Sequence, residues 1–252
     1  MISITMGQIE SMLGQYLWPL IRIMALLMSA PVFAHQTIPA QVKIAAALAM
    51  TLVIAPALPE PVVAVFGAAG WWLVAEQILV GVAIGFSLQI VFAAVELAGD
   101  MIGLQMGLSF ATFVDPQNSS QSPLVGSFLG MIATLLFLSI DGHLLLLSAL
   151  VDSFSVVPVG KGSLAQFSWS HLALLGTNLF SLGLQIALPV LCTMLLVNLS
   201  LGVMARAAPQ LSLFSVGFPL TLATGMLLLV VFLPYMRSPL EQAFRQALRM
   251  WT

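Results

Sequence analysis

Six apolar stretches of membrane-crossing length constrain this chain more than any other feature of its sequence. About 20 apolar residues in a helix cross a hydrocarbon core of about 30 Å. Stretches of this kind occupy residues 16–33, 38–58, 71–95, 124–150, 172–204 and 211–235. The ten-residue alternating pattern of a transmembrane β-barrel does not occur. The sequence therefore predicts an all-α membrane protein, with one integral membrane domain over residues 1–252.

The composition excludes most soluble classes of protein. Of the 252 residues, 60% are apolar and 6% are charged, whereas a soluble domain carries about 25% charged residues. Seven basic and nine acidic side chains cannot cover the surface of such a chain, which excludes a secreted, nuclear or cytosolic monomer. The scattered basic residues form no stripe for phosphates, so nucleic acid is not expected as a partner. Glu10 is the only charge before Arg22, so no cleavable signal is expected.

Two of the stretches are too long for simple spans. Between Pro61 and Pro116 there is no proline, and helix-compatible sequence continues to Phe113. A helix over residues 71–113 would be about 65 Å long at 1.5 Å per residue, about twice the membrane thickness. Residues 172–204 would make a helix of about 50 Å, with Pro189 at a position that allows a kink. We therefore expect kinked helices or helical hairpins.

The few charges indicate an orientation, and the end of the chain indicates an amphipathic helix. With six spans, Lys161, Arg237, Arg245 and Arg249 fall on the side of both termini, against Lys43 and Arg206 on the other side, which favours cytoplasmic termini. Residues 238–252 form a short tail in which five apolar residues recur at helical spacing: Leu240, Phe244, Ala247, Leu248 and Trp251. We expect an anchor at the membrane interface, and a docking face for a cytosolic partner is the alternative.

A glycine-rich segment carries the first candidate site. Gly99, Gly103 and Gly107 lie four residues apart on one helix stripe, which lets another backbone approach closely, and we expect a helix-packing or subunit interface there. Glu96 and Asp100 share a face of the same helix. This carboxylate pair could bind a cation or relay protons, but it is better explained by solvation or by an Arg of a neighbouring subunit. Cys192 is single, which excludes an internal disulfide, and we expect it to be packed.

Two further groups of residues suggest function. Phe110, Phe113 and Val114 precede a polar loop that begins with Asp115 and Pro116. Bulky aromatic side chains beside a flexible loop suit a steric gate, and ordinary helix capping is the alternative. Asp141 and His143 suggest a hydrolase pair, but two residues apart they point to different sides of a helix. A turn at Asp141 and Gly142 explains them better, and no complete catalytic set is found, so we expect neither an enzyme nor a cofactor nor a metal site.

Motifs along nearly the whole chain resemble the FliR family, whose members are flagellar export-gate proteins with injectisome homologues. The middle block and the Asp-Gly-His island are the most specific in combination. The residues that carry the resemblance are Ala30-Pro31-Val32-Phe33 with Pro39 and Lys43; Glu76, Gly81 and Gly85-Phe86; Ala98-Gly99; Ile102-Gly103-Leu104-Gln105-Met106-Gly107-Leu108-Ser109-Phe110-Ala111; Asp115-Pro116; Phe137-Leu138; Asp141-Gly142-His143; Ser153-Phe154; Pro158; Ala187-Leu188-Pro189; Gly202; Arg206; and Pro209-Gln210.

The resemblance implies a subunit of the type III export gate in the bacterial inner membrane and the flagellar basal body. It implies partners FliP, FliQ and FlhB, exported unfolded flagellar proteins, and a cone-like assembly around a channel that lies partly above the membrane plane. A loop that plugs the channel is implied for residues 106–122, which include Met106, Gly107, Phe110, Phe113, Val114, Asp115 and Pro116.

Two other function classes stay open at this point. A secondary transporter would need ionisable side chains that converge at the membrane midplane, and an intramembrane enzyme would need a complete catalytic set. The equivalent subunit of a virulence injectisome is a further alternative. We expect the charged and polar residues of the apolar stretches to be buried with a partner, exposed, or turned to a channel: Glu76, Glu96, Asp100, Asp141, His143 and Arg206. Arg22 joins Glu76, Glu96, Asp100 and Arg206 as a candidate for the transporter.

Overall fold

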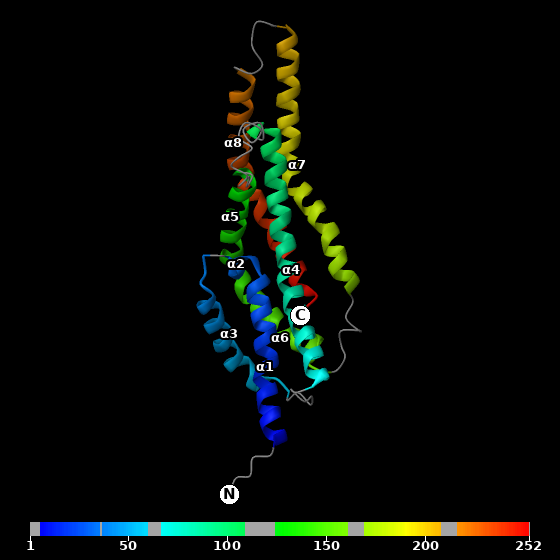
Figure 1. Cartoon of the computed structure of the whole chain (residues 1–252). Helices are drawn as coiled ribbons and strands as arrows, with labels where there is room; N and C mark the ends of the chain where they lie inside the picture. Colours follow the sequence, from blue (N-terminus) through cyan, green and yellow to red (C-terminus); the bar gives the residue numbers. More distant parts are fainter. Residues whose placement is uncertain are drawn as a thin grey trace. The chain divides into compact units, whose positions relative to one another are not determined.

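The computed structural model describes residues 6–35, 37–59, 67–108, 124–160, 169–207 and 216–251 (Figure 1). Every regular element in these ranges is a helix, which confirms the all-α prediction. The elements are α1 (Met6–Ser29), α2 (Pro31–Ala34), α3 (Ala40–Ile54), η1 (Ala55–Ala57), α4 (Ala68–Gln105), α5 (Leu124–Ser139), α6 (Gly142–Val156), α7 (Trp169–Ala207), α8 (Phe218–Phe232), η5 (Leu233–Met236) and α9 (Arg237–Arg249).

The helices match a multi-pass membrane protein. By length and composition, five helical stretches are able to cross a membrane, and a sixth span is possible if α5 and α6 count as one broken span. Counted with this broken span, the six helical stretches agree with the six apolar stretches of the sequence. Large apolar side chains stay exposed on several of these helices, for example Val53 at 79%, Leu196 at 65% and Val230 at 70%. Such surfaces are expected where lipid or another subunit covers the chain.

The long fourth helix is continuous, but it ends earlier than predicted. α4 contains 38 residues, so its length is about 57 Å at 1.5 Å per residue. The expected continuation toward Phe113 is wrong as far as the described residues reach, because the helix ends at Gln105. Gly107 follows with φ +82°, and its amide donates to the Leu104 carbonyl at 3.0 Å. A glycine in the left-handed region is a common way to end a helix.

The other long helix also has the predicted irregularity. α7 contains 39 residues with Pro189 inside, and Figure 1 shows that it changes direction along its length. A proline in a helix leaves one carbonyl of the preceding turn without its backbone donor, which permits such a change. Cys192, which was expected to be packed, is exposed on this helix.

Between α5 and α6 the chain turns at Asp141. Asp141 has φ +55°, a conformation that asparagine and aspartate tolerate better than most residues. Its carbonyl accepts hydrogen bonds from the amides of Leu144 at 2.9 Å and Leu145 at 3.2 Å, and α6 begins at Gly142. The apolar stretch over residues 124–150 is therefore two helices with a break, as the predicted turn at Asp141 and Gly142 requires.

The chain divides into two compact units. Unit 1 consists of Met1–Ile90, Asp141–Leu175 and Phe244–Thr252, and unit 2 of Val91–Ile140 and Gly176–Ala243. A single integral membrane domain over residues 1–252 stays a prediction.

In unit 1, α1 packs closely on α4. A Cβ on Gly81 would meet the Ala25 Cβ at 2.7 Å, and a Cβ on Gly85 would meet the Ala30 amide nitrogen at 2.9 Å. The two glycines lie four residues apart, so they form one smooth stripe on α4 against which α1 rests.

In unit 2, the end of α4 packs against α5 and α7. The rings of Phe92 and Phe137 meet edge to face with centroids 6.0 Å apart. A Cβ on Gly183 of α7 would lie 2.9 Å from the Ala94 carbonyl oxygen. The aromatic contact thus joins α4 to α5, and the close approach at Gly183 joins α4 to α7.

The apolar stripe of the C-terminal tail is buried. The five apolar residues of its stripe are all buried, with exposed fractions of 1% for Leu240, 0% for Phe244, 1% for Ala247, 3% for Leu248 and 0% for Trp251. Trp251 Nε1 also donates to Ser87 Oγ at 3.3 Å, within unit 1. The chain itself therefore covers this apolar stripe, which argues against its insertion into a lipid interface. A docking face for a cytosolic partner stays a prediction for the rest of the tail.

Candidate functional site

The predicted plug begins at a buried residue. Met106 is 1% exposed, and Gly107 follows it in the left-handed turn that ends α4. The remaining candidates lie outside the described residues: Phe110, Phe113, Val114, Asp115 and Pro116. The plug therefore stays a prediction. Of its residues 106–122, the structure describes Met106, Gly107 and Leu108.

The predicted glycine stripe meets a neighbour within the same chain. A Cβ on Gly99 would lie 2.5 Å from the Gly126 Cα and 2.8 Å from the Val125 carbonyl oxygen, both in α5. At Gly103 the approach is looser, with the Val125 Cγ2 at 3.4 Å. Gly107 lies beyond the helix and does not continue the stripe. Gly99 thus lies against α5 inside unit 2, which agrees with the helix-packing alternative, and a subunit interface along the stripe stays a prediction.

The two acidic side chains of α4 lie over two glycines of α5. A Cβ on Gly126 would collide with Asp100 Oδ1, and a Cβ on Gly130 would lie 3.3 Å from Glu96 Oε1. Glu96 is exposed and Asp100 is half-buried. Asp100 Oδ1 has no hydrogen-bond partner among the described residues. The pair thus sits where α5 leaves room for two carboxylates, and Glu96 is open to solvent or to another subunit.

A buried arginine network in unit 1 was not predicted. The Arg22 side chain is fully buried, with an exposed fraction of 0%. It donates three hydrogen bonds: Nε to Gln77 Oε1 at 2.8 Å, Nη1 to Ser153 Oγ at 3.1 Å and Nη2 to the Val157 carbonyl at 2.8 Å. The guanidinium carbon also lies 4.1 Å from the centroid of the Phe154 ring. Arg22 therefore joins α1 to α4 and to the C-terminal end of α6, where a positive charge is favourable.

Other buried polar atoms of unit 1 lie on α1 and α4. Glu76 is 2% exposed and Trp18 is 1% exposed. Glu76 Oε1, Gln77 Nε2 and Trp18 Nε1 have no hydrogen-bond partner among the described residues. A charged side chain within an apolar stretch of sequence indicates a buried polar network. Arg22 and Glu76 are two such side chains. The signal does not name the partners, because Ser153 lies 131 residues from Arg22 in the sequence.

The remaining polar candidates are dispersed. Asp141 is exposed at its turn and His143 is half-buried. His143 Nδ1 has no hydrogen-bond partner in the described part of the chain. Arg206 is exposed in the last turn of α7. Across the described ranges, no group of three His, Cys, Asp or Glu side chains is placed to hold a metal ion.

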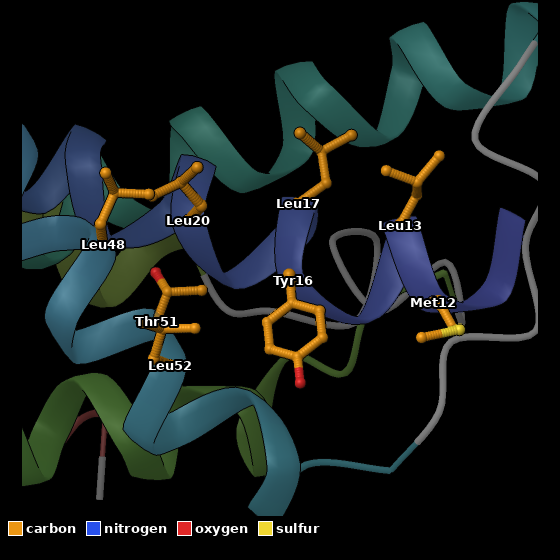
Figure 2. A pocket seen from close by; sticks show the side chains of 8 residues that line it. All are labelled: Met12, Leu13, Tyr16, Leu17, Leu20, Leu48, Thr51 and Leu52. Carbon is orange, nitrogen blue, oxygen red and sulfur yellow. The ribbon is translucent and has the colours of Figure 1, made fainter. Parts of the chain in front are cut away.

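An apolar groove lies between α1 and α3 in unit 1. Its volume is about 520 Å³, and eight side chains line it: Met12, Leu13, Tyr16, Leu17, Leu20, Leu48, Thr51 and Leu52. Figure 2 shows that Leu20 of α1 and Leu48 of α3 point toward one another. Thr51 Oγ1 donates to the Ala47 carbonyl at 2.7 Å, so its hydroxyl is satisfied inside α3. The groove suits apolar side chains or acyl chains.

Comparison with known proteins identifies the family. Residues 13–247 match the model of a family described as bacterial export proteins, family 1. The chain is 44% identical to the flagellar biosynthetic protein FliR of Escherichia coli strain K12, over 98% of this chain and 94% of that protein. It is 42% identical to the protein of the same name from Pectobacterium carotovorum, over 98% and 94% of the two chains. The Bacillus subtilis protein of that name is 32% identical, over 90% and 88%. The chain therefore belongs to the FliR family of bacterial export proteins.

Proposed function

We propose that this chain is a subunit of the flagellar type III protein export gate and forms part of the channel for unfolded flagellar proteins. The observation that carries the proposal is the family match over residues 13–247, together with 44% identity to a flagellar biosynthetic protein over almost the whole of both chains. The names of the compared relatives are flagellar, which favours a flagellum over a virulence injectisome.

The exposed apolar surface supports a subunit of a larger assembly. In unit 1, α3 exposes Leu52 at 65% and Val53 at 79%, and the groove beside it has an apolar lining. In unit 2, Leu199 of α7 is exposed at 66%. Apolar surface of this kind needs lipid or further protein. Other subunits, for which we propose FliP, FliQ and FlhB, would cover part of it.

The plug is the second part of the proposal. An export channel wide enough for an unfolded polypeptide must be sealed against ions when it is idle, and apolar side chains seal by sterics and dewetting. Residues 106–122, with Phe110 and Phe113, supply this seal in our proposal. The support is the aromatic sequence after α4 and the turn at Gly107, where the helix ends. The chain then lies in the bacterial inner membrane at the flagellar basal body, with cytoplasmic termini and partly above the membrane plane.

Co-purification tests the assembly. An affinity-tagged chain is extracted in mild detergent from cells that also express FliP, FliQ and FlhB from the same genome. The proposal expects a hetero-oligomer that contains FliP and FliQ, and little stable protein when the chain is expressed alone. A stable homo-oligomer without FliP or FliQ would contradict the proposal and favour a secondary transporter.

A further inference from the structure

The part of α9 that belongs to unit 1 has one side covered and one side exposed. The covered residues recur at helical spacing and are at most 3% exposed: Phe244, Ala247, Leu248 and Trp251. Between them, Arg245 and Arg249 are exposed. They are four residues apart, so they lie on one face of the helix, one turn from each other. The buried side thus fixes which side of α9 faces outward, and that outward side is basic.

Basic charge is concentrated on α9, although the chain as a whole has a formal net charge of −2. The helix contains three of the seven basic residues of the chain and one of its nine acidic residues. A positive charge in the last turn of a helix interacts favourably with the helix dipole. This effect accounts for Arg249, which lies in the last turn, but it does not require Arg245 one turn earlier.

The sequence before α9 is that of a membrane span that ends at the headgroups. By length and composition, the helical stretch Phe218–Arg249 is able to cross a membrane, and its first part, α8, contains no charged residue. The first charged residue after α8 is Arg237, and Tyr235, two residues earlier, is 72% exposed. Tyrosine and tryptophan are enriched where spans meet the headgroups. The basic helix therefore follows directly on an apolar span and an aromatic residue typical of the membrane interface.

We propose that the exposed face of α9 at Arg245 and Arg249 binds the phosphate groups of anionic phospholipids. Basic residues beside a membrane span are attracted to anionic headgroups. An arginine has five N–H donors, so it can donate to a phosphate and keep a contact within its own chain. The apolar stripe stays on the core of unit 1, so the helix contacts the headgroups without insertion into the hydrocarbon. A lipid is favoured over an acidic protein segment because the helix follows directly on a span. The inference does not depend on the proposed gate.

Two double variants of the full chain separate charge from structure. Arg245→Gln with Arg249→Gln removes both charges, whereas Arg245→Lys with Arg249→Lys removes both guanidinium groups and keeps the charges. Arg206→Gln is the control, because Arg206 is also exposed and also lies in the last turn of its helix. The complete complex is extracted in mild detergent and titrated with phosphatidylglycerol, which is anionic, or with phosphatidylcholine, which is not. Native mass spectrometry then counts the lipid molecules bound to each complex.

The wild-type complex is expected to prefer phosphatidylglycerol, less so at high salt. The preference falls about 5-fold for each arginine replaced by glutamine, and the lysine pair and Arg206→Gln keep it.

An unchanged preference in the glutamine pair would overturn the inference. An equal loss in the lysine pair would overturn it too, because charge would not be the cause, and so would an equal loss per charge in Arg206→Gln. An unchanged lipid preference with lower recovery of another subunit would assign the face to an acidic protein segment instead. If the glutamine pair does not assemble, Arg245→Gln and Arg249→Gln are measured singly, and each must lower the preference for the inference to stand.

Discussion

Arg22 Nε donates a hydrogen bond of 2.8 Å to Gln77 Oε1, 55 residues further along the chain, and this bond joins α1 to α4 inside unit 1. The guanidinium reaches two acceptors of α6 as well, Ser153 Oγ and the carbonyl of Val157. One side chain with a planar set of five donors thus connects three helices. An isolated charge in an apolar helix is tolerated when it is paired in this way.

Arg22→Gln is expected to destabilise the protein strongly. The shorter amide cannot reach all three acceptors, and a buried acceptor without a partner costs about 1–3 kcal/mol. Arg22→Lys keeps the charge but lacks the planar guanidinium, so the stability of this variant is expected to lie between those of the wild type and Arg22→Gln. The measurement is the Tm of the detergent-solubilised complex, with Arg237→Gln as the control because Arg237 is exposed. An Arg22→Gln complex that melts like the control would show that the network does not stabilise unit 1.

Substitutions at the two glycines that face α5 are expected to differ in their effect on stability. Gly99→Ala places a Cβ 2.5 Å from the Gly126 Cα, where only backbone can move, so a loss of about 1–3 kcal/mol is expected from overpacking. Gly103→Ala meets a valine methyl group at 3.4 Å and is expected to be nearly neutral. Gly103→Leu adds more bulk and is expected to lose about 1–3 kcal/mol. Recovery and Tm are measured beside Gly176→Ala, where a Cβ meets nothing within 4 Å. Equal behaviour of Gly99→Ala and Gly176→Ala would place the close contact elsewhere.

Truncating Trp251 is expected to destabilise unit 1 although it is the penultimate residue. Trp→Ala in a core costs about 3–5 kcal/mol, and the hydrogen bond to Ser87 is lost in addition. Trp251→Phe keeps most of the apolar volume and is expected to lose less. Tyr235→Ala serves as the control because Tyr235 is 72% exposed. If the tail were a membrane anchor, Trp251→Ala would leave the Tm unchanged and weaken only the attachment to lipid.

Local sequence predicted the apolar helices and two of their irregularities. Apolar length predicts the spans, Pro189 predicts a change of direction in α7, and Asp141 with Gly142 predicts the break between α5 and α6. Each of these features depends on residues close together in the chain. The end of α4 at Gln105 was predicted too late, because apolar sequence continues beyond the left-handed Gly107.

Contacts between distant helices could not be predicted in the same way. The stripe that ends in Trp251 has the periodicity of an amphipathic helix, whether lipid or the chain itself covers it. The stripe at Gly99 permits a close approach, but the sequence does not say whether α5 or another subunit makes it. The partners of Arg22 lie on α4 and α6, so only the tertiary structure brings them together.

The most direct test of the proposed gate is the permeability of cells that carry a deletion of residues 110–119. The plug is expected to contribute little to the folded core, so the complex is recovered at close to the wild-type amount. The inner membrane then admits a small dye or ions that the wild-type cells exclude. Normal assembly with unchanged permeability would contradict the account, because these residues would not be the seal. Loss of the complex would contradict it as well, since the segment would then be structural.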